Sequence, residues 1–104
     1  MLSIQISAEA ANVVLGGPYG SEGRLREDTL EAVQAGRRVA VTTSGGDTHL
    51  AWRFEATLDQ AEDLDDWLER GAEALKPSDE TTASILFRAE ADVAAAMAQA
   101  RLQK

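Results

Sequence analysis

The chain has 104 residues, 44% of them hydrophobic, which is enough for one folded domain with a modest core. It contains no cysteine, so disulfides and thiolate metal sites are excluded, and no segment is apolar enough over its length to span a membrane. Ten Lys and Arg against eighteen Asp and Glu give a net charge of -8, which opposes direct binding to nucleic acid or anionic lipid and favours a basic protein partner. The start of the chain lacks the basic and apolar regions of a signal peptide, so we expect a cytoplasmic protein.

The first elements are short. Alternation predicts a strand at the start of the chain, with Leu2, Ile4 and Ile6 on its buried face. Ser7 suits the N-cap of a brief helix over Ala8–Leu15, although the end of this segment is also compatible with an extended chain. Residues 16–23 are rich in glycine and predict a loop with an exposed aromatic, a candidate partner contact, at Tyr19.

A helix is predicted within Arg24–Ala35. Asp28 and Glu31 have the spacing of a capping box, and Gly36 supplies a stop signal. Apolar and polar residues also alternate here, so a strand is the competing interpretation.

Arg37–Ala56 predicts a β-hairpin, because two alternating runs flank the loop residues 44–47. If Gly45 and Gly46 form the loop, Arg38 lies opposite Arg53. A loop of Gly46 and Asp47 would shift the pairing but keep the faces. Either way, one face is apolar and buried, with Val39, Val41, Leu50, Trp52 and Phe54. The other face carries Arg38, Ala40, Thr42, His49, Ala51, Arg53 and Glu55.

Three further elements follow the hairpin. Apolar residues at helical spacing predict a helix over Asp59–Leu75, which Pro77 prevents from continuing. Alternation predicts a strand over Thr82–Arg88, with Ala83, Ile85 and Phe87 on one face, and an alanine-rich helix follows over Glu90–Gln103. The predicted fold is therefore a single α+β domain, residues 1–104, with an antiparallel sheet in the ferredoxin-like βαββαβ order, helices on one face and a C-terminal helix added.

No pattern of catalytic residues is present. The glycine-rich segment matches neither phosphate-binding fingerprint, no serine lies in a nucleophile elbow, and His49 is the only histidine. One histidine with Asp47 nearby is too few ligands for zinc. We therefore expect no enzyme activity, no metal and no cofactor.

Two surfaces are candidates for partner binding. The first is an acidic stripe along the helix after the hairpin, formed by Asp59, Glu62, Asp66, Glu69 and Glu73. The second is the polar sheet face with Arg38, His49 and Arg53, where two opposed arginines would repel each other unless something covers them. The final helix or a second copy of the chain, as a homodimer, is expected to provide that cover.

These features favour a small acidic protein that works by protein–protein interaction, of the inhibitor, antidote or immunity type, including phage anti-defence proteins. A dimeric ferredoxin-like ligand-binding or regulatory module is the alternative, and an enzyme of unknown type acting through His49 is the third possibility.

Overall fold

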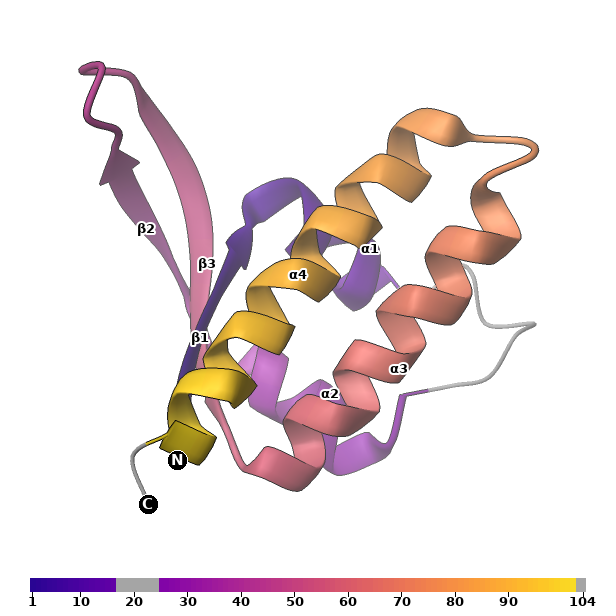
Figure 1. Ribbon diagram of the computed structural model, residues 1–104, viewed down its shortest axis with the longest axis horizontal. Coiled ribbons are helices and arrows are strands. Elements are labelled where there is room, and N and C mark those ends of the chain that lie inside the picture. Colours follow the sequence, from indigo (N-terminus) through magenta and orange to yellow (C-terminus); the bar gives the residue numbers. More distant parts are fainter. Residues whose placement is uncertain (17–24, 103–104) are drawn as a thin grey trace.

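The computed structural model describes residues 1–16 and 25–102. Tyr19 and most of its glycine-rich segment lie outside this part of the chain. In chain order the elements are β1 (Leu2–Ser7), α1 (Ala8–Gly16), α2 (Glu27–Gln34), β2 (Arg37–Thr42), β3 (Thr48–Ala56), α3 (Leu58–Leu75) and α4 (Glu80–Leu102). The strands form one antiparallel sheet in the order β1-β3-β2 (Figure 1). The α+β class is confirmed, but the order βααββαα differs from the predicted ferredoxin-like order.

The largest difference lies in α4, a single helix where we predicted a strand and then a shorter helix. Asp79 starts it: its carboxylate accepts hydrogen bonds from the backbone N–H and the hydroxyl of Thr82, at 3.1 and 2.7 Å. The buried residues of α4 recur every three or four positions, at Ala83, Leu86, Ala89, Val93 and Met97. The alternation at 82–88 was therefore coincidental, because helical packing buries Leu86 completely and leaves Phe87 38% exposed.

The hairpin is confirmed, but its register is shifted by one residue. The backbone N–H of Thr43 donates to the carbonyl of Asp47 at 2.8 Å, which leaves a three-residue loop in which Gly46 has φ +87°. Arg37 therefore lies opposite Arg53, and Arg38 lies opposite Trp52. Since a one-residue slip exchanges the faces of one strand relative to the other, the predicted grouping of side chains was wrong.

In the observed sheet, Val39 and Val41 share a face with Ala51 and Arg53, not with Trp52. On the opposite face, apolar residues of β1 lie beside those of β3, with Ile4 opposite Phe54 and Ile6 opposite Trp52. Ala40 and Ala51, which we expected to lie together on a covered face, are on opposite faces of the sheet. Ala51 is buried, whereas Ala40 is exposed.

Helices surround β1 and the adjoining part of β3, while the far half of the β2–β3 hairpin projects beyond them (Figure 1). Contacts of α2 with β3 include a 2.8 Å hydrogen bond from the Trp52 indole to the carbonyl of Val33. α3 packs chiefly on α4, and α4 lies along β1. Fully buried side chains from both long helices, including Leu64, Leu68 and Val93, complete the core. No helix in the described part of the chain is long and apolar enough to cross a membrane.

The two shorter helices begin in different ways. Ser7 caps α1 as predicted, since its hydroxyl accepts the backbone N–H of Ala10 at 3.1 Å. α2 confirms the helix over the competing strand, but Asp28 lies inside its first turn, and its N-cap Arg26 makes no side-chain cap. The backbone N–H of Arg26 instead donates to the carboxylate of Asp63 in α3, at 3.0 Å. The predicted capping box is therefore wrong, because a tertiary contact takes its place.

Candidate functional site

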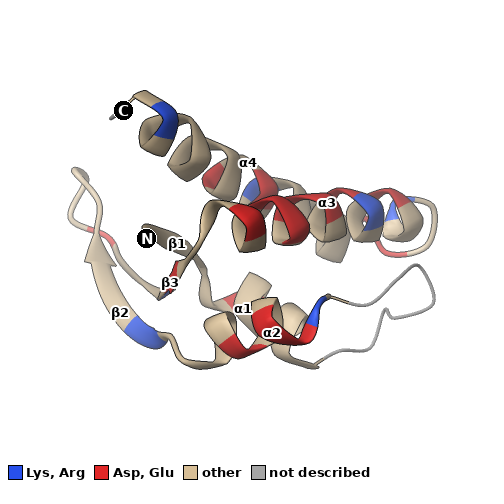
Figure 2. Cartoon of the chain, turned by 90° about the horizontal axis from the view of Figure 1, so that it is seen from below, with Lys and Arg blue, Asp and Glu red and all other residues tan. Residues whose placement is uncertain are grey.

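The predicted acidic stripe is present and faces solvent. Its five carboxylates come from one long helix, α3, whose other side is buried against α4, and all five residues are exposed: Asp59, Glu62, Asp66, Glu69 and Glu73. α2 lies beside α3 and adds Glu27, Asp28 and Glu31, so acidic residues follow both helices (Figure 2). The sequence predicted the stripe because helical periodicity alone sets which residues share a helix face.

Arginines offset part of this charge. Arg26 bridges α2 and α3 by pairing with Asp28 at 2.7 Å and with Asp59. Arg70 pairs with Asp66 one turn away at 2.9 Å, and Arg101 of α4 reaches Glu62 at 3.4 Å. These pairs are solvent-exposed, so each contributes little to stability. The stripe remains strongly acidic.

Two residues of the stripe, Glu69 and Glu73, also border the seam between α3 and α4, where Asp65 and Glu90 lie. We call Asp65, Glu69, Glu73 and Glu90 the seam cluster. Burial raises the pKa of Asp65, and the charges of Glu69 and Asp66 raise it further. Burial likewise raises the pKa of Glu90, with added repulsion from the other three members. One oxygen of Asp65 and one of Glu90 are buried without a hydrogen-bond partner. The folded protein therefore holds negative charge here at an energetic cost.

The sequence did not predict the seam cluster. Glu90 was assigned to the first turn of a short helix that began after a strand. Its place opposite α3 follows only from the continuous helix α4, which packs antiparallel to α3 along its length (Figure 1).

The three predicted basic residues do not form one site. His49 lies opposite Val41 near the far end of the hairpin, on the same face as Arg53. Arg38 lies on the other face, opposite Trp52. The like-charged cross-strand pair that we expected does exist, but it joins Arg37 to Arg53.

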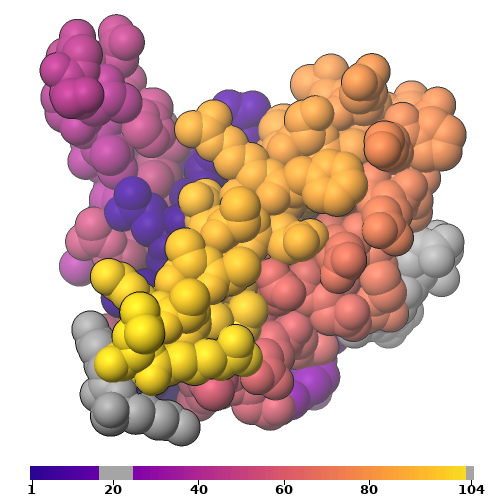
Figure 3. All heavy atoms as spheres, in the orientation of Figure 1, coloured from indigo at the N-terminus to yellow at the C-terminus, as the bar shows by residue number. Residues whose placement is uncertain are grey.

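A groove separates the hairpin from α4, and Figure 3 shows it as a notch beside the projecting hairpin. It measures about 680 Å³ and is lined by His49 and Leu50 on one side and by Ile85, Arg88 and Asp92 on the other. Burial raises the pKa of Asp92, and the charge of Arg88 opposes that shift. His49 therefore has charged neighbours, Arg88 and Asp92, across a groove.

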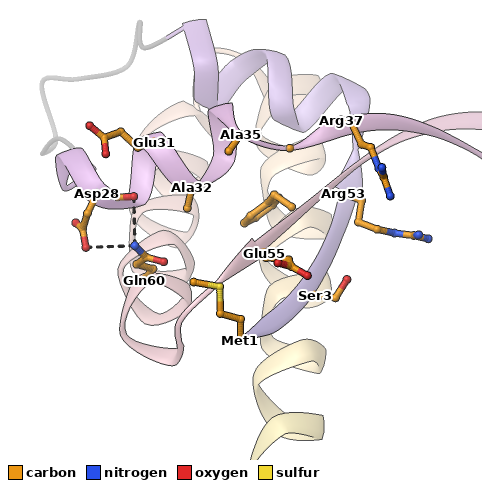
Figure 4. A pocket seen from close by; sticks show the side chains of 12 residues that line it. Met1, Ser3, Asp28, Glu31, Ala32, Ala35, Arg37, Arg53, Glu55 and Gln60 are labelled. Carbon is orange, nitrogen blue, oxygen red and sulfur yellow. Dashed lines mark hydrogen bonds between the residues drawn. The ribbon is translucent and has the colours of Figure 1, made fainter.

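A second pocket, of about 550 Å³, lies where β2 begins and the edge of β3 faces α2 (Figure 4). Its lining includes Arg37 from β2, Arg53 and Glu55 from β3, Ser3 from β1 and Glu31 from α2. Asp28 also lines it, but it accepts hydrogen bonds from Arg26 and Gln60. The other charged residues that line this pocket are Arg37 and Arg53 of the sheet and the carboxylates of Glu31 and Glu55.

Within residues 1–16 and 25–102, no group of three or more histidines and carboxylates is placed to hold a metal ion. Comparison with protein-family models, with curated proteins and with solved structures finds no match to the chain.

Proposed function

We propose that the chain is a non-enzymatic protein that acts by binding a protein with a basic surface, as inhibitors, antidotes and immunity proteins do. The seam cluster is the observation that carries this proposal. It shares Glu69 and Glu73 with the acidic stripe, and the charges that act on Asp65 come from other carboxylates. A basic partner would relieve this repulsion, so binding gains free energy that folding alone does not recover.

The two acidic groups together make the partner-binding surface. The stripe provides exposed charges that steer a basic partner and set its orientation. The seam cluster adds the partly desolvated charges of Asp65 and Glu90, whose repulsion by Glu69 and Glu73 a lysine or arginine of the partner relieves. A phage-encoded anti-defence protein is one setting for such a surface.

A charge-matched pull-down tests this function. Glu69→Gln, Glu73→Gln and Glu90→Gln together remove three charges from the acidic surface, and we expect them to abolish capture of a stoichiometric basic partner from host lysate. Glu9→Gln, Asp47→Asn and Glu80→Gln remove the same number from exposed sites on α1, the hairpin and the start of α4, and should leave capture intact.

The captured complex should also dissociate at high salt, because the exposed part of the interaction is screened. Equal capture by the two triple variants would contradict the proposal. So would a captured partner that resists high salt, since its binding would then rest on apolar contacts.

The alternative function, a ligand-binding or regulatory module, draws its support from the pocket at the start of β2. Self-association as a homodimer remains a prediction, which the mass of the purified chain in solution would test.

A further inference from the structure

The pair Arg37 and Arg53 is unusual in so acidic a chain. The two residues lie directly opposite each other on adjacent strands, so their side chains start about 5 Å apart on one face of the sheet. Both are exposed, and no carboxylate of the described residues lies within ion-pairing distance of either. Like charges at such positions destabilise a sheet. The fold thus maintains a cationic pair with which no carboxylate of residues 1–16 and 25–102 forms an ion pair.

The side chain of Arg53 and the backbone before Arg37 are also held in place. Arg53 donates to the side-chain oxygen of Gln5 at 2.9 Å, and Gln5 lies opposite it on β1, so the row Arg37, Arg53 and Gln5 crosses all three strands. Arg37 follows Gly36, where the backbone passes so close to β3 that no side chain fits. Figure 4 shows both arginine side chains on the same side of the sheet, with Ser3 and Glu55 below them.

We propose that Arg37, Arg53 and Ser3 bind the phosphate group of a small phosphate monoester. Two guanidinium groups match the charge of a phosphate dianion and bind its oxygens through paired hydrogen bonds. A ligand with a single carboxylate would balance only one of the two positive charges. Ser3, on β1 opposite Glu55 and on the same face as Arg53, adds a hydroxyl donor. At about 550 Å³ the pocket is within the size range of small-molecule sites and larger than a phosphate group needs.

The rest of the pocket defines the remainder of the ligand. Glu55 follows Arg53 by two residues on the same face of the sheet, and Glu31 lines the part of the pocket across the edge of β3, beside α2. Ionised carboxylates only accept hydrogen bonds, so the part of the ligand beyond the phosphate is one that donates them, with hydroxyl or amino groups. A phosphorylated sugar or polyol has this character. The site is separate from the acidic surface of α3 and α4, and its test does not depend on the proposed protein partner.

Titration of the purified full-length chain, followed by backbone amide NMR shifts, tests the site with inorganic phosphate as the probe. We expect phosphate to shift the amides of Ser3, Arg37 and Arg53, and acetate at equal ionic strength to shift them much less. Arg37→Gln and Arg53→Gln should each weaken phosphate binding about tenfold. Arg38→Gln is the matched control, because it removes the same charge from the next residue on the opposite face. It should change the affinity less than about twofold.

Two further measurements sharpen the assignment. Glu55→Gln removes a repelling charge and should tighten binding of inorganic phosphate, while a hexose phosphate should bind the original chain more tightly than inorganic phosphate does. Arg37→Gln should not lower thermal stability in phosphate-free buffer, since it relieves repulsion. Equal weakening by all three arginine variants, equal responses to acetate and phosphate, or no amide shift near the pair would overturn the proposal.

Discussion

At Gly36, which joins α2 to β2, the structure leaves no room for a side chain. A Cβ atom there would lie 2.4 Å from Nε1 of Trp52, 2.6 Å from the carbonyl oxygen of Arg53 and 2.8 Å from Cβ of Phe54. Backbone and Cβ atoms in the sheet do not yield without moving β3. Trp52 is also fixed, since its indole donates to Val33. The identity of this one residue therefore sets how closely α2 approaches the sheet.

We expect Gly36→Ala to lower the free energy of unfolding by about 2 kcal/mol or more, because the added methyl group forces strands apart. Urea denaturation measures the change. Gly45→Ala is the matched control: its Cβ would meet only the hydroxyl of Thr43, at 3.9 Å, and its backbone does not have positive φ. It should change stability by less than about 0.5 kcal/mol. Similar losses at both glycines would show that close approach at Gly36 is not the cause.

At the scale of elements, α4 makes the clearest experimental distinction between the predicted strand and the observed helix. In the strand, Phe87 would lie on the core face and Leu86 outside it. In the helix, Leu86 is fully buried and Phe87 is 38% exposed. We expect Leu86→Ala to cost about 3 kcal/mol of stability through the cavity it leaves. Phe87→Ala should cost less than about 1 kcal/mol. If urea denaturation showed a larger loss of stability for Phe87→Ala than for Leu86→Ala, the result would support the predicted strand over the helix.

Sequence patterns located most elements because their signals are local. The alternation of β1, the Ser7 cap of α1 and the periodicity of α3 depend on neighbouring residues only. Residues 82–88 satisfy both an alternating and a helical pattern, and only the packing of Leu86 against other elements decides between them. The hairpin register depends on whether the loop has two or three residues, which the glycines alone did not determine.

The same limits apply to the candidate sites. The acidic stripe was predictable, since it needs one helix. The seam cluster and the arginine pair were not, because Glu90 joins the first only through α3–α4 packing and Arg37 joins the second only through the true register. The available signal was a pair of opposed arginines in an acidic sequence, but the predicted register placed Arg38, not Arg37, opposite Arg53.

At the scale of the whole molecule, charge is segregated. Acidic residues line α2 and α3, while arginines mark the strands of the hairpin (Figure 2). With a net charge of -8, the folded protein experiences self-repulsion, which is most concentrated at the seam cluster, where the carboxylates are also partly desolvated. The acidic surface therefore has a cost in stability that should appear in the pH dependence of unfolding.

The raised pKa of Glu90 determines in which direction stability changes with pH. Burial and neighbouring carboxylates raise its pKa in the folded protein above the ordinary value, so the folded state binds a proton more readily than the unfolded chain. Stability from this group therefore falls as the pH rises through the unfolded pKa and the raised folded pKa. We expect Glu90→Gln to increase the free energy of unfolding at neutral pH, with the gain shrinking as the pH is lowered to about 4. Glu80→Gln removes the same charge from the first turn of α4, where the helix dipole favours an acid, and should give no gain. Urea denaturation across this pH range measures both variants, and a gain for Glu90→Gln that is independent of pH would show that its charge is not the cause.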